Sequence, residues 1–93
     1  MNQHVLARLM QSFANASLPD KVLLAASLHY AKHKDERIVE EAKNAWMEAV
    51  KLEVELQYVV DLYRRGLADY TPLLQRYVEI AEFIVRVLGE ALG

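Results

Sequence analysis

The sequence predicts an all-α protein, arranged as an antiparallel four-helix bundle in which two short helices precede a long helical hairpin. Three observations carry this prediction. Apolar residues recur at helical spacing along nearly the whole chain. There is no alternating apolar and polar run, and no Asn-Gly or Asp-Gly pair that would mark a β-hairpin. Three breaks divide the helical pattern, and 93 residues are a length that fits a single domain, residues 1–93.

The first two helices are expected to be short. Residues 2–14 carry one apolar face at i, i+3 and i+4 spacing. Its members are Val5, Leu6, Leu9, Met10 and Phe13. A second helix is predicted over residues 18–32, with Ser17 as its N-cap and Pro19 in the first turn, where the missing N–H is not needed. This second helix is apolar nearly all round, so we expect neighbours to cover it on several sides.

The third helix is predicted to be the longest, over residues 36–65, and it carries two apolar lines. The first alternates steps of four and three residues, which is a heptad pattern. It consists of Ile38, Ala42, Ala45, Ala49, Leu52, Leu56, Val59 and Tyr63. The second, which we call the i+4 ridge, consists of Trp46, Val50, Val54, Tyr58 and Leu62. A surface helix of a monomer needs one apolar stripe, so the second line predicts an interface with a partner.

The fourth helix is predicted over residues 72–92. Gly66 is expected to end the preceding helix in a left-handed conformation, and Asp69 or Thr71 to cap the new one. Its predicted seam is Leu74, Tyr77, Ala81, Ile84, Leu88 and Ala91. Because both flanks of that seam are apolar as well, this helix is expected to pack against at least two neighbours.

The four helices differ too much in length to cover one another. At 1.5 Å per residue the third would be about 45 Å long and the first two only about 20–23 Å each. Val54, Tyr58 and Leu62 would then stay exposed, in a patch larger than monomers usually present. We therefore predict a homodimer formed through the third and fourth helices. Another partner protein on the same surface, or a monomer with an unevenly covered long helix, are the alternatives.

Composition narrows the class of function. Thirteen acidic and 11 basic residues give a net charge of −2, which argues against a general nucleic-acid coat. The absence of cysteine excludes disulfides, thiolate metal sites and cysteine nucleophiles. The N-terminus has no signal-peptide pattern, and no apolar run is long enough to span a membrane, so the sequence predicts a cytoplasmic protein that does not contact membranes.

These features together predict a small non-enzymatic interaction or scaffolding module, with no cofactor and no metal, because no convergent polar site is found. Two alternatives stay open. His29 and His33 stand at i, i+4, so both rings can face one way and form a ligand, metal or phosphoryl-transfer site. The basic residues could instead contact nucleic-acid phosphates. These residues are Lys32, Lys34, Arg64 and Arg65.

Two smaller features qualify these alternatives. The tract His29-Tyr30-Ala31-Lys32 resembles the His-x-x-Lys core of histidine phosphotransfer domains, which are helical bundles that relay phosphoryl groups. The resemblance covers four residues, and His33 stands where that family usually has a small residue. Glu53 lies on the flank of the heptad seam, where a half-buried carboxylate would have either a chemical role or a contact with solvent or with an arginine of a partner.

Overall fold

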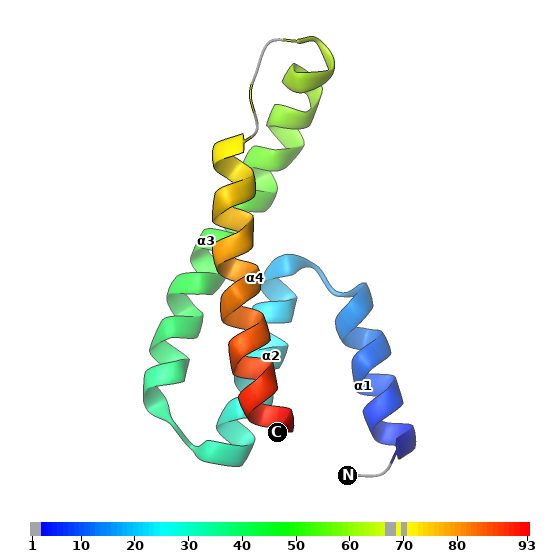
Figure 1. Ribbon diagram of the computed structural model, residues 1–93, viewed down its shortest axis with the longest axis vertical. Helices are drawn as coiled ribbons and strands as arrows, with labels where there is room; N and C mark the ends of the chain where they lie inside the picture. Colours follow the sequence, from blue (N-terminus) through cyan, green and yellow to red (C-terminus); the bar gives the residue numbers. More distant parts are fainter. Residues whose placement is uncertain (1–2, 67–68, 70) are drawn as a thin grey trace.

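The protein is seen here in a computed structural model that describes residues 3–66, 69 and 71–93, without the side chains of Val5, Leu6 and Leu9. The described residues form four α-helices and no strand, which confirms the all-α prediction. These helices are α1 (Gln3–Asn15), α2 (Leu18–His33), α3 (Glu36–Arg64) and α4 (Thr71–Leu92) (Figure 1). Their bounds differ from the predicted ranges by one residue or none, and the predicted first residue, Asn2, lies outside the described residues.

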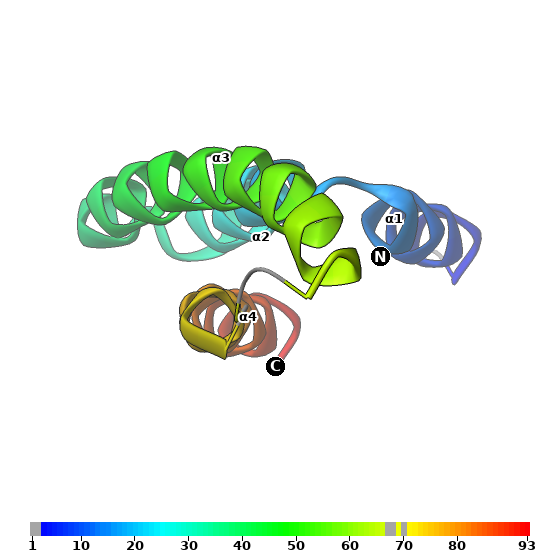
Figure 2. The same cartoon turned by 90° about the horizontal axis from the view of Figure 1, so that it is seen from above.

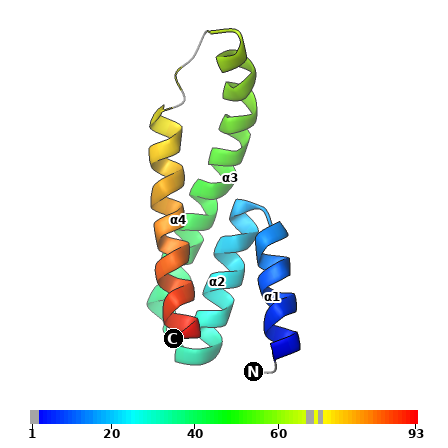
Figure 3. The ribbon, with the colours of Figure 1, turned by 45° about the vertical axis from the view of Figure 1, so that its right-hand side comes forward.

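Helices α2, α3 and α4 share one hydrophobic core, whereas α1 lies to one side, next to α2 (Figures 1 and 3). The fully enclosed core side chains are Val22 and Ala25 of α2, Ala49 and Leu52 of α3, and Val87 of α4. Among the described side chains of α1, only Phe13 packs against this core, and it is partly buried. The four-helix bundle arrangement is therefore not confirmed, and the molecule is extended, measuring 48 × 29 × 16 Å.

Local sequence signals place the helix ends. The Ser17 hydroxyl accepts a hydrogen bond from the Asp20 N–H at 3.3 Å, at the start of α2. At the end of α2, Lys34 adopts a left-handed conformation with φ +54°, which is uncommon for a residue other than glycine. Gly66 follows α3 with φ +71°, the left-handed conformation that its place after the helix predicts. Helix ends of this kind fix the lengths of the helices and thereby the extent of the core.

The buried face of α4 differs from the predicted seam. Ile84 of the predicted seam is buried, together with Ile80 and Val87 of one flank, whereas Leu74 and Tyr77 of the predicted seam are exposed. The cause is that α4 is apolar over more than half of its circumference, so periodicity alone does not identify the side that meets α2 and α3. The true core face is rotated toward one of the two apolar flanks, and the other flank is left outside.

The core stops short of one end of the molecule. In the part of the chain between Glu53 and Glu79 that the structure describes, no residue is buried. We call residues 53–64 of α3 together with residues 71–79 of α4 the distal hairpin. It projects beyond the N-terminal end of α2 in Figure 1. The radius of gyration is 15.1 Å, against about 12 Å for a compact chain of this length.

Candidate functional site

The i+4 ridge of α3 is largely exposed. Val54 and Tyr58 have exposed fractions of 65% and 70%, and Trp46 and Val50 are exposed as well, whereas Leu62 is partly buried. Each step of four residues advances the ridge by about 40° around the helix axis. The ridge therefore winds about 120° around α3 between Trp46, which lines the groove beside α2, and Tyr58 in the distal hairpin.

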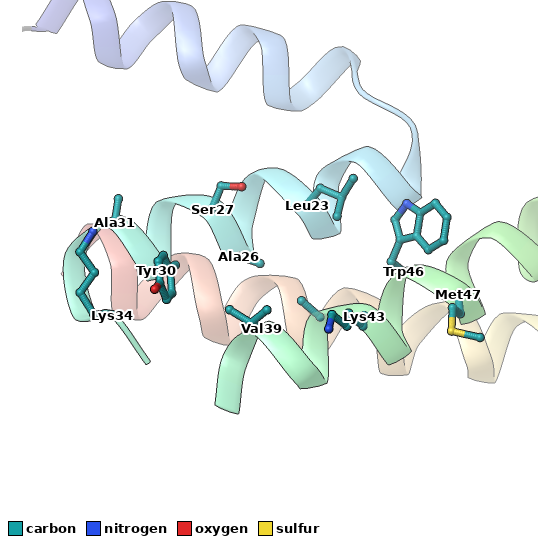
Figure 4. Close-up of a pocket in the computed structure, with 11 residues that line it drawn as sticks. Leu23, Ala26, Ser27, Tyr30, Ala31, Lys34, Val39, Lys43, Trp46 and Met47 are labelled. Atoms are coloured by element: carbon teal, nitrogen blue, oxygen red, sulfur yellow. The ribbon is translucent and has the colours of Figure 1, made fainter. Parts of the chain in front are cut away.

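An open apolar groove runs between α2 and α3, and Trp46 is part of its wall (Figure 4). Its volume is about 670 Å³. Leu23 and Trp46 stand at one end, and Tyr30 and Lys34 at the other (Figure 4). The lining residues are Leu23, Ala26, Ser27, Tyr30, Ala31, Lys34, Val39, Ala42, Lys43, Trp46 and Met47. The lining includes Lys34 and Lys43 and no acid, so the groove presents apolar surface with ammonium groups at its edge, of which that of Lys43 also pairs with Glu40 at 3.2 Å.

A second apolar surface runs along α4, and we call it the α4 stripe. Its members recur in steps of four and three residues. They are Leu74, Val78, Ala81, Val85, Leu88 and Leu92. Val85 has an exposed fraction of 70%, and the surface depression at the first part of the stripe also includes Glu79 and Glu82. In the sequence, Leu74, Ala81 and Leu88 belong to the predicted core seam and the remaining members to an apolar flank of that seam. The unbroken heptad spacing of all six residues was a signal that they form a separate surface.

The other side of the α3–α4 pair is polar and already paired. The Arg76 guanidinium lies 3.2 Å from a carboxylate oxygen of Glu48 and also hydrogen-bonds Glu55. The hydrogen bond to Glu55 is the main cause that raises the pKa of Arg76 above its ordinary value. Arg86 pairs with Glu41 at 2.6 Å. Since these charges are satisfied within the chain, this side is a poor candidate for an apolar interface.

His29 and His33 lie where the C-terminal ends of α2 and α4 meet. Nε2 of His29 is 2.8 Å from Oε2 of Glu90, and Nε2 of His33 is 3.1 Å from the backbone oxygen of Glu90. The two ring centroids are 4.6 Å apart. His29 is 97% buried, because its residue exposure is 3%. Both histidines thus tie the last turns of α4 to α2.

This geometry gives little support to the chemical alternative. Among the described residues, no group of three or more His, Cys, Asp or Glu side chains is arranged to hold a metal ion. A phosphoryl acceptor has to be reached by its donor, and the ring of His29 is enclosed and hydrogen-bonded to Glu90. Its Nδ1 atom makes no hydrogen bond within the described part of the chain.

The two basic clusters do not come together. Lys32 and Lys34 lie at the end of α2, and Arg64 and Arg65 lie at the far end of α3, at opposite ends of the molecule (Figure 1). Arg65 is also 3.3 Å from the carboxylate of Asp61. The arrangement therefore does not form the single phosphate-binding patch on which the nucleic-acid alternative depends.

Glu53 has a contact that the sequence did not predict. Its Oε1 atom accepts a hydrogen bond at 3.2 Å from the backbone N–H of Leu18, the first residue of α2. A carboxylate at a helix N-terminus satisfies an otherwise unpaired N–H and complements the helix dipole. The signal available in the sequence was the half-buried register of Glu53, which did not identify α2 as the partner.

Searches against protein-family models, curated proteins and solved structures find no match to this chain. Within the described residues, no helix combines the length and the apolar character needed to cross a bilayer. The function therefore has to be inferred from the surfaces of the chain itself.

Proposed function

We propose that this protein is a non-enzymatic interaction module that forms homodimers through apolar surfaces of α3 and α4. The observation that carries the proposal is the amount of surface left uncovered. The accessible area is 6717 Å², against about 5,500 Å² for a compact monomer of 10.7 kDa. The excess of roughly 1,200 Å² exceeds the area of about 800 Å² that each partner contributes to a typical stable interface.

The uncovered surface is apolar where the proposal needs it to be. Val54, Tyr58 and Val85 each expose about two thirds of their side chains to solvent. A large apolar side chain contributes about 1.5–3 kcal/mol when it passes from water into a packed interior, before the cost of association. A second copy of the chain is the simplest partner, because twofold dimers are the commonest closed assemblies. It would also supply the helix that completes a four-helix bundle around α2, α3 and α4.

The proposed interface includes the i+4 ridge, and the ridge provides the first test. Val54→Glu and Tyr58→Glu each place a charge on the exposed ridge without removing a core contact. We expect the wild-type chain to sediment as a dimer at micromolar concentration and both variants to sediment as monomers with unchanged helical circular dichroism. Gln11→Glu on α1 is the matched control for the added charge, and it should leave the dimer intact.

The result that would overturn the proposal is a wild-type chain that remains monomeric up to about 100 μM. A dimer that neither ridge variant weakens would show that the interface lies elsewhere on the surface.

We also expect the protein to lie in the cytoplasm, as its cysteine-free composition suggests, and cell fractionation would check this. The second candidate is a different protein that binds the same ridge. It would be favoured if the wild-type chain were a monomer that co-purifies with a partner, and if Tyr58→Glu lost that partner.

A further inference from the structure

We infer that the two apolar surfaces are complementary: the α4 stripe of one copy docks into the α2–α3 groove of a second copy. This inference rests on the proposed homodimer and specifies which surfaces meet. The groove carries Lys34 and Lys43 among apolar side chains and has no acidic lining residue, although Lys43 also pairs at 3.2 Å with Glu40, which stands outside the lining. The first part of the stripe carries Glu79 and Glu82 beside apolar side chains and has no basic residue in its depression.

Charge selects this pairing over the alternatives. Helix α1 of a second copy is also amphipathic, but its charged residue is Arg8, and a basic helix is repelled by a groove edged with lysines. Two α4 stripes packed against each other in antiparallel orientation would bring Glu82 close to its own copy near the midpoint of the stripe. The stripe-to-groove contact instead sets carboxylates near ammonium groups.

The stripe is long enough to fill the groove. The groove follows α2 from Leu23 to Lys34, about 16–17 Å, and the stripe runs along α4 from Leu74 to Leu92, about 27 Å. The floor of the groove is made by Ala26 and Ala42, whose small side chains let a helix approach closely.

A reciprocal pair of such contacts closes a dimer about a twofold axis. The docked helix then lies beside α2 and α3. Trp46 is the ridge residue that lines the groove. Val54 and Tyr58 do not line it, so their contribution to the dimer requires the interface to continue from the groove along the ridge. This arrangement differs from a same-surface interface, in which the ridge of one copy meets the ridge of the other.

A mixing experiment separates the two arrangements. Met47→Glu spoils the groove, and Val85→Glu spoils the stripe; both side chains are exposed, at 51% and 70%, so the fold should tolerate the changes. Each variant alone should be monomeric at a concentration at which the wild-type chain is dimeric. An equimolar mixture retains one intact stripe and one intact groove, and it should associate at least about tenfold more tightly than either variant alone.

Charge reversal gives a second test that does not depend on apolar substitutions. Lys43→Glu and Glu82→Lys should each weaken the dimer about threefold at low salt, and the double variant should recover most of this loss. Gln11→Glu serves again as the control. A dimeric wild-type chain whose mixed variants associate no better than the single ones overturns the stripe-to-groove contact and leaves the homodimer standing. A wild-type chain that stays monomeric overturns both.

Discussion

The same two helices, α3 and α4, run through two regions that differ in packing. Between Ile38 and Leu52, α3 packs against α2 and the second half of α4, and its core positions are buried. In the distal hairpin the two helices continue without α2, and no described residue there is buried. Along α3 the apolar content is similar in the two regions, with nine of the 15 residues 38–52 and seven of the 12 residues 53–64 apolar. The comparison therefore indicates that α3 has a buried core face where a third helix covers it, rather than where its sequence is more apolar.

The boundary between the two regions coincides with the start of α2. The backbone N–H of Leu18 binds Glu53 there, one residue after the last buried residue of α3, Leu52. Beyond this point Leu56 and Val59 continue the heptad seam but are only partly buried. The proposed dimer would use part of the apolar surface that α2 leaves uncovered on α3 and α4, together with the groove between α2 and α3.

The largest change in the free energy of unfolding is expected from a comparison of two leucines that lie one turn apart on the heptad seam of α3. Leu52→Ala removes a fully enclosed side chain and should lower the free energy of unfolding by about 3 kcal/mol. Leu56→Ala, in the distal hairpin, should lower it by only about 1 kcal/mol, because water already reaches this side chain. Urea denaturation at a concentration at which the chain is monomeric measures both. Equal losses would mean that the core extends into the distal hairpin.

The next contrast concerns the link between the ends of α2 and α4. Glu90→Ala removes the acceptor of the buried His29 ring and should cost about 1.5 kcal/mol, since a buried polar group is left without its partner. It should also speed hydrogen exchange in the last turns of α4. Glu79→Ala, at an exposed position on the same helix, is the control and should change stability by less than about 0.5 kcal/mol. Slow exchange retained in Glu90→Ala would show that packing and the remaining backbone contact of His33 hold the end of α4 without the His29–Glu90 hydrogen bond.

Replacing each of two glycines by alanine should change the free energy of unfolding by a smaller amount, downward at Gly66 and upward at Gly89. Gly66 has φ +71°, so Gly66→Ala forces a side chain into the left-handed region and should lower the free energy of unfolding by about 1 kcal/mol. Gly89 lies within α4, and a Cβ atom there would meet open space. Gly89→Ala should therefore raise stability by about 0.5–1 kcal/mol. Thermal melts of both variants at one concentration test the difference, and a shift in the same direction for both would contradict it.

The sequence was sufficient to predict the helices and not the way they pack. Caps and breakers such as Ser17 and Gly66 act within a few residues, so the helix bounds followed from local chemistry. The exposure of Val54 and Tyr58 agrees with the length comparison that predicted it. The homodimer itself stays a prediction that none of these observations tests.

What the sequence could not supply depends on contacts between distant residues. Glu41 stands four residues after Arg37, a spacing that favours an ion pair within one helix, but it pairs with Arg86 of α4. The contact of Glu53 with α2 and that of His29 with Glu90 join residues 35 and 61 positions apart. Periodicity describes one helix at a time, so it does not reveal which flank of α4 faces the core or where the groove opens.

The smallest expected effect is a difference in acid sensitivity between the starts of α3 and α4. A backbone hydrogen bond from Arg37 is the main cause that lowers the pKa of Asp35, and hydrogen bonds from Thr71 lower that of Asp69, both from the ordinary 3.8. A carboxylate whose pKa is lower in the folded chain stabilises the fold above its unfolded value, and this contribution is lost as the pH falls through the folded value. Asparagine caps helices about as well as aspartate and does not titrate, so Asp35→Asn should flatten the pH dependence of global unfolding below about pH 4. For Asp69→Asn the change should be confined to local opening of the distal hairpin, as hydrogen exchange at acidic pH would show. An acid unfolding curve of Asp35→Asn that matches the wild-type curve would mean that folding does not lower the pKa of the Asp35 carboxyl group.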